Sequence, residues 1–467
     1  MKKNSLMIGI VVLFVVSAFS PVINGNNIKI TNKQITQSTS SSNGMMDSSW
    51  PMYQHDAANT GFSSSSFPDS LNLLYNNTYE EILHSAFASF QSAPILADGK
   101  IFIAGWGAEA DIIALHENNG SLIWKKRLPL YDSSTTFGFV NSPVVSNGKV
   151  FVCFGSMMVD FPPQSKIFAL DENTGEIVWE NHFFTSSGYP SLTISDDKVI
   201  VGGHFTNVIP ISRLYVFNVD NGDLIWSKTM LGFFESTPAV ANNIVFATTS
   251  CISPMTIGFN APLFSGRARV YAFDLNDGSK IWNARIKGHV IVSSPTVSNG
   301  KLLVPSTIHI GRFITNRRIT SLDVETGNEI WHYEKKRNGF YSCWPASISA
   351  PSVAYGIIFL NDATGLIIAL DENTGEKLWE NEIIDDVASP SMCSTVPPVI
   401  ADYKVITASY ERDNYVEKSE ICMFNVTNGD KIWITEFDVS EHGIHTPFVL
   451  ANGKLLINSG ENIYVYS

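Results

Sequence analysis

One phrase recurs through this chain at a nearly constant spacing. It reads Ala-Leu-Asp-Glu-Asn-Thr-Gly at Ala169–Gly175 and again at Ala369–Gly375, and each copy ends in Trp four residues after the Gly. Looser copies bring the number to seven, with closing tryptophans at Trp124, Trp179, Trp226, Trp282, Trp331, Trp379 and Trp433. Successive tryptophans are 55, 47, 56, 49, 48 and 54 residues apart. A period of this length indicates a repeat architecture in which each unit packs on the next.

Each repeat predicts four short strands. The recurring phrase joins two alternating apolar runs through a polar turn ending in Gly, which is the pattern of a β-hairpin. A second hairpin lies upstream, for example at Ser92–Gly105 and Ser142–Gly155. Four antiparallel strands per repeat, at this period, predict the blades of a β-propeller.

The two ends of the repeat region complement each other. The strand expected at Leu71–Asn77 has no hairpin partner before it, whereas Thr446–Ser467 supplies three strands and no Trp-bearing fourth. Joining them makes an eighth blade and removes an open edge that would otherwise invite aggregation. The sequence therefore predicts an all-β, eight-bladed propeller of four-stranded antiparallel blades over residues 50–467, its last blade closed by the N-terminal strand.

The first 49 residues read as a leader and a linker. Met1-Lys2-Lys3 precedes an apolar run, Leu6–Phe19, so we expect a signal peptide at 1–25; a retained N-terminal anchor is the alternative. Residues 26–49 are rich in Ser, Thr and Asn and predict a flexible linker. No cysteine precedes Cys153, which argues against a lipoprotein, and no second apolar run is long enough to span a membrane. We expect a protein that is secreted or at the cell surface.

Composition excludes some partners. The net charge is −13, and nucleic-acid binding requires a basic surface, so no nucleic-acid partner is expected. With 44% hydrophobic and 16% charged residues the chain has enough apolar surface for a large core.

The full phrase resembles the signature of the PQQ-like repeat β-propeller family, A-x-D-x-x-T-G-x-x-x-W. Ala169, Asp171, Thr174, Gly175 and Trp179 match it, as do the equivalent residues of Ala369–Trp379. The resemblance covers about residues 50–467 and implies that the repeated Trp packs between neighbouring blades. The family includes quinoprotein dehydrogenases, the assembly scaffold BamB and extracellular proteins of unassigned role, so the fold alone does not give the function.

The resemblance to quinoproteins does not extend to their chemical landmarks. Those enzymes carry a disulfide between adjacent cysteines near the quinone, and a calcium ion. The five cysteines here are Cys153, Cys251, Cys343, Cys393 and Cys422, and none is adjacent to another. Asp171–Glu176 is similar to a calcium loop, but its Gly comes one position too early, so we interpret it as a turn. No catalytic, cofactor-binding or metal-binding residue is nominated, and PQQ with calcium is kept only as an alternative.

The connections predict which rim of the disc binds. First and third turns of a blade open on one face, and here they are mostly short, whereas the second turns and the links between blades vary in length. Thr249–Ala268, Pro305–Arg318 and the link His332–Ser349 are long examples. Long loops on one rim of a rigid scaffold indicate binding, although their apolar residues could instead cover the channel or a blade. The candidate partner-binding residues are Met255, Ile257, Phe259, Leu263, Phe264, Arg312, Arg317 and Arg318.

Two covalent features are also expected. Cys343 and Cys393 occupy equivalent places after Trp331 and Trp379, which makes them a candidate disulfide. Asn76, Asn119 and Asn425 stand in sequons and are candidate glycosylation sites, with chance occurrence as the alternative.

The first functional hypothesis is an exported, non-enzymatic scaffold for a protein or glycan of the cell surface or envelope. The second is a PQQ-dependent dehydrogenase of alcohols or sugars.

Overall fold

The computed structural model describes residues 49–467 except 85–91, 106–110, 130–137, 157–164, 186–191, 206–209, 252–266, 289–292, 311–313, 337–347, 363–364, 384–395, 414–415 and 439–445. The expected signal peptide and, apart from Ser49, the expected linker lie outside these residues.

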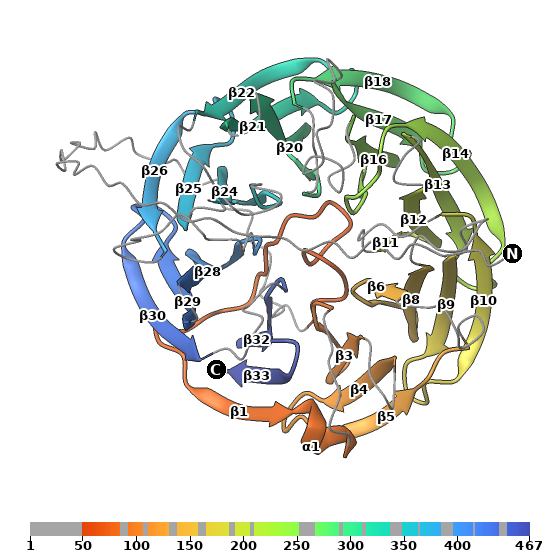
Figure 1. Ribbon diagram of the computed structural model, residues 1–467, viewed down its shortest axis with the longest axis vertical. Helices are drawn as coiled ribbons and strands as arrows, with labels where there is room; N and C mark the ends of the chain where they lie inside the picture. The colour runs from red at the N-terminus through yellow and green to blue at the C-terminus, as the bar shows by residue number, and fades with distance from the viewer. Residues whose placement is uncertain are drawn as a thin grey trace, which may run out of the picture. The chain divides into compact units, whose positions relative to one another are not determined.

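Eight antiparallel sheets, here called blades 1 to 8, form a ring (Figure 1). The strands of each blade are given from the innermost outward. Blade 1 consists of β2 (Ile95–Ala97), β3 (Lys100–Ala104), β4 (Ile112–His116) and β5 (Leu122–Lys126), and blade 2 of β7 (Val144–Ser146), β8 (Lys149–Ser156), β9 (Ser165–Asp171) and β10 (Ile177–Phe183). Blade 3 consists of β11 (Thr193–Ser195), β12 (Lys198–His204), β13 (Ile211–Asn218) and β14 (Leu224–Leu231), and blade 4 of β15 (Ala239–Ala241), β16 (Ile244–Thr249), β17 (Ala268–Asp274) and β18 (Lys280–Ile286). Blade 2 has one further strand, β6 (Gly138–Val140), paired with β8.

Blades 5 to 7 repeat this order. Blade 5 consists of β19 (Thr296–Ser298), β20 (Lys301–Ile310), β21 (Ile314–Asp323) and β22 (Glu329–Lys335). Blade 6 consists of β23 (Ser352–Ala354), β24 (Ile357–Asp362), β25 (Leu366–Asp371) and β26 (Lys377–Glu382), and blade 7 of β27 (Val399–Ala401), β28 (Lys404–Asp413), β29 (Val416–Asn425) and β30 (Lys431–Asp438). Blade 8 combines β31 (Val449–Ala451), β32 (Lys454–Asn458) and β33 (Asn462–Tyr466) with β1 (Leu73–Thr78). A single helical turn, α1 (Tyr79–Leu83), follows β1.

Blade 8 closes the ring as the sequence predicts. Strand β1 pairs antiparallel with β33 from Leu73 opposite Tyr466 to Thr78 opposite Asn462. Beyond the strand ends, the backbones of Asn72 and Ser467 exchange two hydrogen bonds of 2.8 and 3.0 Å. The innermost strand of each blade contacts that of the next, and β31 contacts β2. The predicted eight-bladed architecture with its shared last blade is therefore confirmed.

The recurring Gly and Trp belong to the contact between neighbouring blades. In six blades the indole Nε1 donates a hydrogen bond of 2.9 to 3.1 Å to a backbone carbonyl at the third turn of the next blade. The turn glycine of that next blade lies under the indole ring; a Cβ atom on Gly327, for example, would come within 2.6 Å of Trp282. Trp433, which precedes blade 8, packs on Tyr466 with 6.3 Å between ring centroids. The Gly of one repeat thus accommodates the Trp of the repeat before it.

Residues Trp50–Ser63, here called the axial strap, run along the innermost strands at the centre of the ring (Figure 1, red). In six blades the central residue of the innermost strand donates its N–H to a strap carbonyl, at 2.6 to 3.2 Å. The donors are Leu96, Val145, Val240, Val297, Val353 and Ile400, and the acceptors are Trp50, Pro51, Ala57, Ala58, Thr60 and Gly61. The strap therefore satisfies backbone groups that an innermost strand would otherwise leave unpaired.

Candidate functional site

Part of the surface singled out by the sequence is not described. Met255, Ile257, Phe259, Leu263, Phe264 and Arg312 lie outside the described residues, as do Cys343 and Cys393. Cys153 and Cys422 are buried and form no disulfide with a described cysteine, and the Cys422 thiol donates a hydrogen bond to the Ile383 carbonyl at 3.2 Å. Of the sequon asparagines, Asn76 and Asn119 are exposed. Asn425 is half-buried and its side-chain oxygen accepts a 2.8 Å hydrogen bond from the Thr427 N–H of its own turn.

The prediction of a long loop at Pro305–Arg318 is wrong, because most of this segment is strand. β20 continues to Ile310 and β21 begins at Ile314, so this hairpin is longer than those of most other blades. Arg317 and Arg318 lie in β21 and are 2% and 3% exposed. The prediction assumed that the charges of both arginines face water. Here neighbouring strands supply carboxylates that allow both to be buried.

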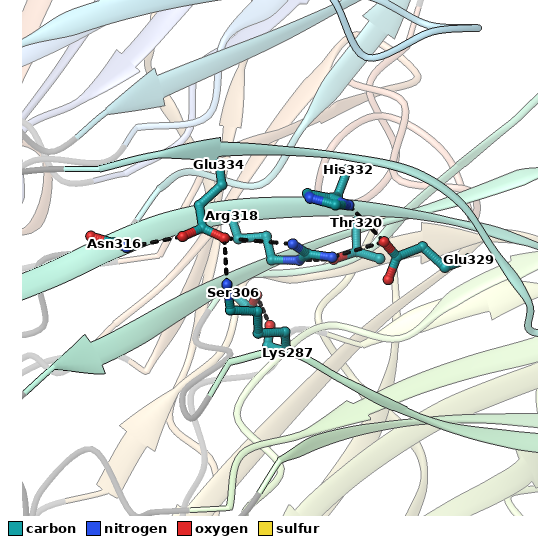
Figure 2. Close-up of polar contacts among 8 residues, drawn as sticks. All are labelled: Lys287, Ser306, Asn316, Arg318, Thr320, Glu329, His332 and Glu334. Atoms are coloured by element: carbon teal, nitrogen blue, oxygen red, sulfur yellow. Dashed lines mark hydrogen bonds and ion pairs between the residues drawn. The ribbon is translucent and has the colours of Figure 1, made fainter.

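Arg318 lies at the centre of a polar cluster that joins blades 4 and 5 (Figure 2). Its guanidinium contacts Glu329 at 2.8 Å and Glu334 at 3.6 Å, and its Nε donates to Thr320 at 3.0 Å. Glu334 also accepts from Lys287, in the link after blade 4, at 2.8 Å. Burial acts to raise the pKa of Glu334, but hydrogen bonds from Lys287 and Asn316 hold it below its ordinary value.

Arg317 plays the same part between blades 5 and 6. It forms an ion pair with Asp362 of β24, which is fully buried. Lys335 of β22 lies 4.0 Å from the same carboxylate and 3.1 Å from Glu380 of β26. Both arginines therefore stabilise contacts between blades, and neither is available to a partner.

The same rim carries a pocket of about 360 Å³ between blades 3 and 4, here called the arginine pocket. Its lining residues come from the connection before β13, the link between the two blades and the ends of β16, β17 and β18. They are Pro210, Leu231, Gly232, Thr249, Ser250, Cys251, Arg267, Arg269 and Arg285.

The floor of this pocket is fixed by hydrogen bonds between the blades. Gly232 N–H donates to the Pro210 carbonyl at 2.7 Å, and Phe233 and Ser250 exchange two backbone hydrogen bonds of 2.8 Å. The Thr249 hydroxyl donates to the Leu231 carbonyl at 2.8 Å. Gly232 has φ +115°, and a Cβ atom there would lie 2.5 Å from Thr249 Oγ1, so both the backbone and the space require glycine.

Among the described lining residues of the pocket, Cys251 is the one ionisable group besides the three arginines, and it is neutral at pH 7. Burial raises the pKa of the Cys251 thiol to about 11, so the sulfur is a weak hydrogen-bond donor and not a thiolate nucleophile. Outside the lining, two residues after Phe233, burial raises the pKa of Glu235 to about 8. The pocket is consequently positive and has no activated nucleophile among its lining residues.

The described side chains give no support to the quinone-and-calcium alternative. Within the described ranges, no group of three or more His, Cys, Asp or Glu side chains could hold a metal ion. The Asp171 carboxylate of the calcium-like phrase accepts hydrogen bonds from its own turn; those from Thr174, at 2.9 and 3.0 Å, lower its pKa most. In the described part of the chain no helix is long and apolar enough to cross a membrane.

The arginine pocket could have been found from the sequence by register. Arg285 lies three residues after the blade Trp, as does Glu334 in blade 5, and Arg269 is its cross-strand partner. The axial strap has no comparable signal, because it binds mainly through backbone carbonyls.

Comparison with known proteins gives relatives of different activities. The chain is 23% identical over 280 residues to tetrathionate hydrolase of Acidithiobacillus ferrooxidans, covering 58% of this chain and 49% of that protein, so it spans about half the length of that relative. It is 22% identical over 327 residues to outer membrane protein assembly factor BamB of Yersinia pestis, covering 62% and 77%.

Among solved structures, the quinohemoprotein alcohol dehydrogenase of Comamonas testosteroni superposes with a TM-score of 0.62 at 13% identity, over 90% of this chain and 80% of that one. BamB of Moraxella catarrhalis gives 0.51 at 17% identity, over 85% and 98%. These likenesses show the fold alone. A family profile described as outer membrane protein assembly factor BamB matches residues 74–250 and 253–466, and the chain belongs to this family of PQQ-like repeat propellers.

Proposed function

We propose that this chain is an exported, non-enzymatic propeller scaffold that binds a protein partner in the cell envelope. The observation that carries the proposal is the axial strap, which takes the central N–H of the innermost strand in six blades. The protein's own backbone thus occupies the inner edge of the ring at this level. The surface that remains for recognition is the rim with long connections between rigid blades.

The relatives support a scaffold without excluding an enzyme. Several of them are named as outer membrane protein assembly factors, which motivates both the envelope location and a protein as the partner. The alternative is a quinone-dependent dehydrogenase, favoured by the structural likeness to quinohemoprotein alcohol dehydrogenase. Against it stand the separated cysteines and the lack of a metal-binding cluster within the described residues.

Capture from the native envelope with matched variants tests the proposal. The bait is the purified protein, and the rim variant replaces residues 252–266, inside the expected loop Thr249–Ala268, with a short Gly-containing turn, which keeps the Thr249 and Ser250 hydrogen bonds to the link between blades 3 and 4. The control is Glu325→Ala with Glu376→Ala, two exposed third-turn residues on the opposite face. We expect one protein to be retained by the wild type and the control and lost from the rim variant, with nearly unchanged melting of all three. Equal capture by the rim variant, or a large fall in its melting temperature, would contradict partner binding at this rim.

A second assay tests the alternative directly. The protein is incubated with PQQ and calcium and examined for cofactor absorbance and for dye reduction with alcohols and sugars. We expect neither signal. Either one would replace the scaffold proposal with the dehydrogenase.

A further inference from the structure

Two arginines face each other across the strands that form the arginine pocket. Arg269 of β17 is directly opposite Arg285 of β18 in the register, and Arg267 lies two residues before Arg269. Like charges directly opposite on antiparallel strands are destabilising. None of the three guanidinium groups makes an ion pair or hydrogen bond with a described side chain. The chain as a whole has a net charge of −13, so a cluster of three arginines with no Asp or Glu among the described lining residues is unusual in it.

Blades 5 and 1 place an acidic group near the arginine at the same position, whereas blade 7 has Glu420 opposite Glu436 there. Three residues after the blade Trp, blade 5 has Glu334 opposite Arg318, and the two are 3.6 Å apart. At that place blade 1 has Arg127, whose charge acts on Asp111 and lowers its pKa, although burial, the larger influence, keeps that pKa above its ordinary value. Blade 4 therefore lacks an acidic group that the fold accommodates elsewhere. An anion from outside the chain would supply it.

We propose that the arginine pocket binds a small anionic ligand whose oxyanion group bridges Arg269 and Arg285, with Arg267 at the mouth. A guanidinium presents paired N–H donors that match carboxylate, sulfate and phosphate oxygens. The volume of about 360 Å³ is in the range of small-molecule sites. Leu231, 55% exposed, gives the pocket an apolar wall, so an anion with a short carbon skeleton fits as well as an inorganic one. This site is independent of the protein partner proposed above.

Thermal unfolding and calorimetry of the whole protein test the site. The probes are sulfate, phosphate, acetate and succinate, each compared with sodium chloride at equal ionic strength. We expect at least one to raise the melting temperature in a saturable way beyond the chloride control. The inorganic and carboxylate arms identify which source of the oxyanion the pocket prefers. Responses equal to chloride for all four would overturn the proposal.

Single substitutions locate the binding. Arg269→Gln or Arg285→Gln should weaken the best probe about tenfold or more, because each removes charge-assisted hydrogen bonds. Arg127→Gln is the matched control, since it removes the same charge at the same register position of blade 1; it should bind as the wild type does. Equal weakening by Arg127→Gln would show a general charge effect and would contradict the site.

The unliganded variants separate a binding role from a structural one. Because Arg285 is exposed and faces a like charge, Arg285→Gln should melt at or slightly above the wild-type temperature without ligand. A clear decrease would mean that the arginine stabilises the fold. Arg285→Lys, which keeps the charge and loses the paired donors, should bind more weakly than the wild type and melt like it.

Discussion

Removing β33 should destabilise the whole ring and not only blade 8. Deletion of Asn462–Ser467 removes the strand that pairs β1 with β32. Ile463 and Val465 are fully buried, and Tyr466 is 8% exposed and packs on Trp433. At about 1.5–3 kcal/mol for each buried side chain, the loss is about 5–9 kcal/mol before the released backbone pairing of β1 is counted. That is comparable with the whole stability of many domains.

Calorimetry with a local probe measures this loss. For roughly 400 folded residues, 1 kcal/mol corresponds to about 1 °C, so we expect the melting temperature to fall by at least about 5–9 °C. Limited proteolysis should also cut the released segment around β1. Val465→Ala, at a buried site, should cost roughly 1–3 kcal/mol, whereas Val178→Ala, where the side chain is 49% exposed, should cost little. A truncated protein that melts like the full chain would refute the claim that the ends hold the ring closed.

The other predictions concern the strap, the interblade contact and pH. Asn59→Ala should lower the free energy of unfolding by about 2–4 kcal/mol in denaturant titration, because the buried amide donates to the carbonyls of Pro238 and Pro295 at 3.2 and 2.9 Å. Asn119→Ala, at an exposed turn, is the control, and an equal loss of stability in both variants would refute the stabilising role of the strap. Gly327→Ala should lower the free energy of unfolding by several kcal/mol and Gly300→Ala by only about 1 kcal/mol, because both glycines have positive φ but only a Cβ atom on residue 327 would collide with Trp282. Similar losses in the two variants would mean that the indole can move aside. Glu235 binds its proton more tightly in the folded state than when unfolded. Stability should therefore fall as pH rises from about 4.5 to 8, by at most about 5 kcal/mol, and a Glu235→Gln variant with the same pH profile would contradict this assignment.

The repeat made the architecture predictable, because the same sequence phrase encodes both a turn and a packing contact between blades. Gly327 needs its left-handed backbone for the turn and its missing side chain for Trp282, so Gly and Trp recur together at a fixed spacing. The same regularity allowed the blades to be counted and the shared last blade to be inferred.

Two features were not foreseen, for different physical reasons. Arg317 and Arg318 were expected in a loop because the connection Pro305–Arg318 is long. Their acidic partners lie on the paired strand β22 and on β24 of the next blade, and these contacts follow from the pairing of strands and blades, not from the local sequence. The axial strap is held mostly by backbone carbonyls, so its side chains show no periodic pattern. Arg269 and Arg285 were within reach of register counting from Trp282, but only comparison among blades reveals that their opposing acid is missing.

The strap and the shared blade set the order in which this chain can fold. Gly61 bonds Ile400, and Leu73 is paired with Tyr466, contacts that span 339 and 393 residues of sequence. Contacts this distant are slow to form, because loop-closure entropy is lost before they stabilise anything. The strap and β1 therefore reach their native places only after the later blades are available to pair with them. Until β33 pairs with β1 and β32, both strands keep an unpaired edge that is open to pairing with another chain.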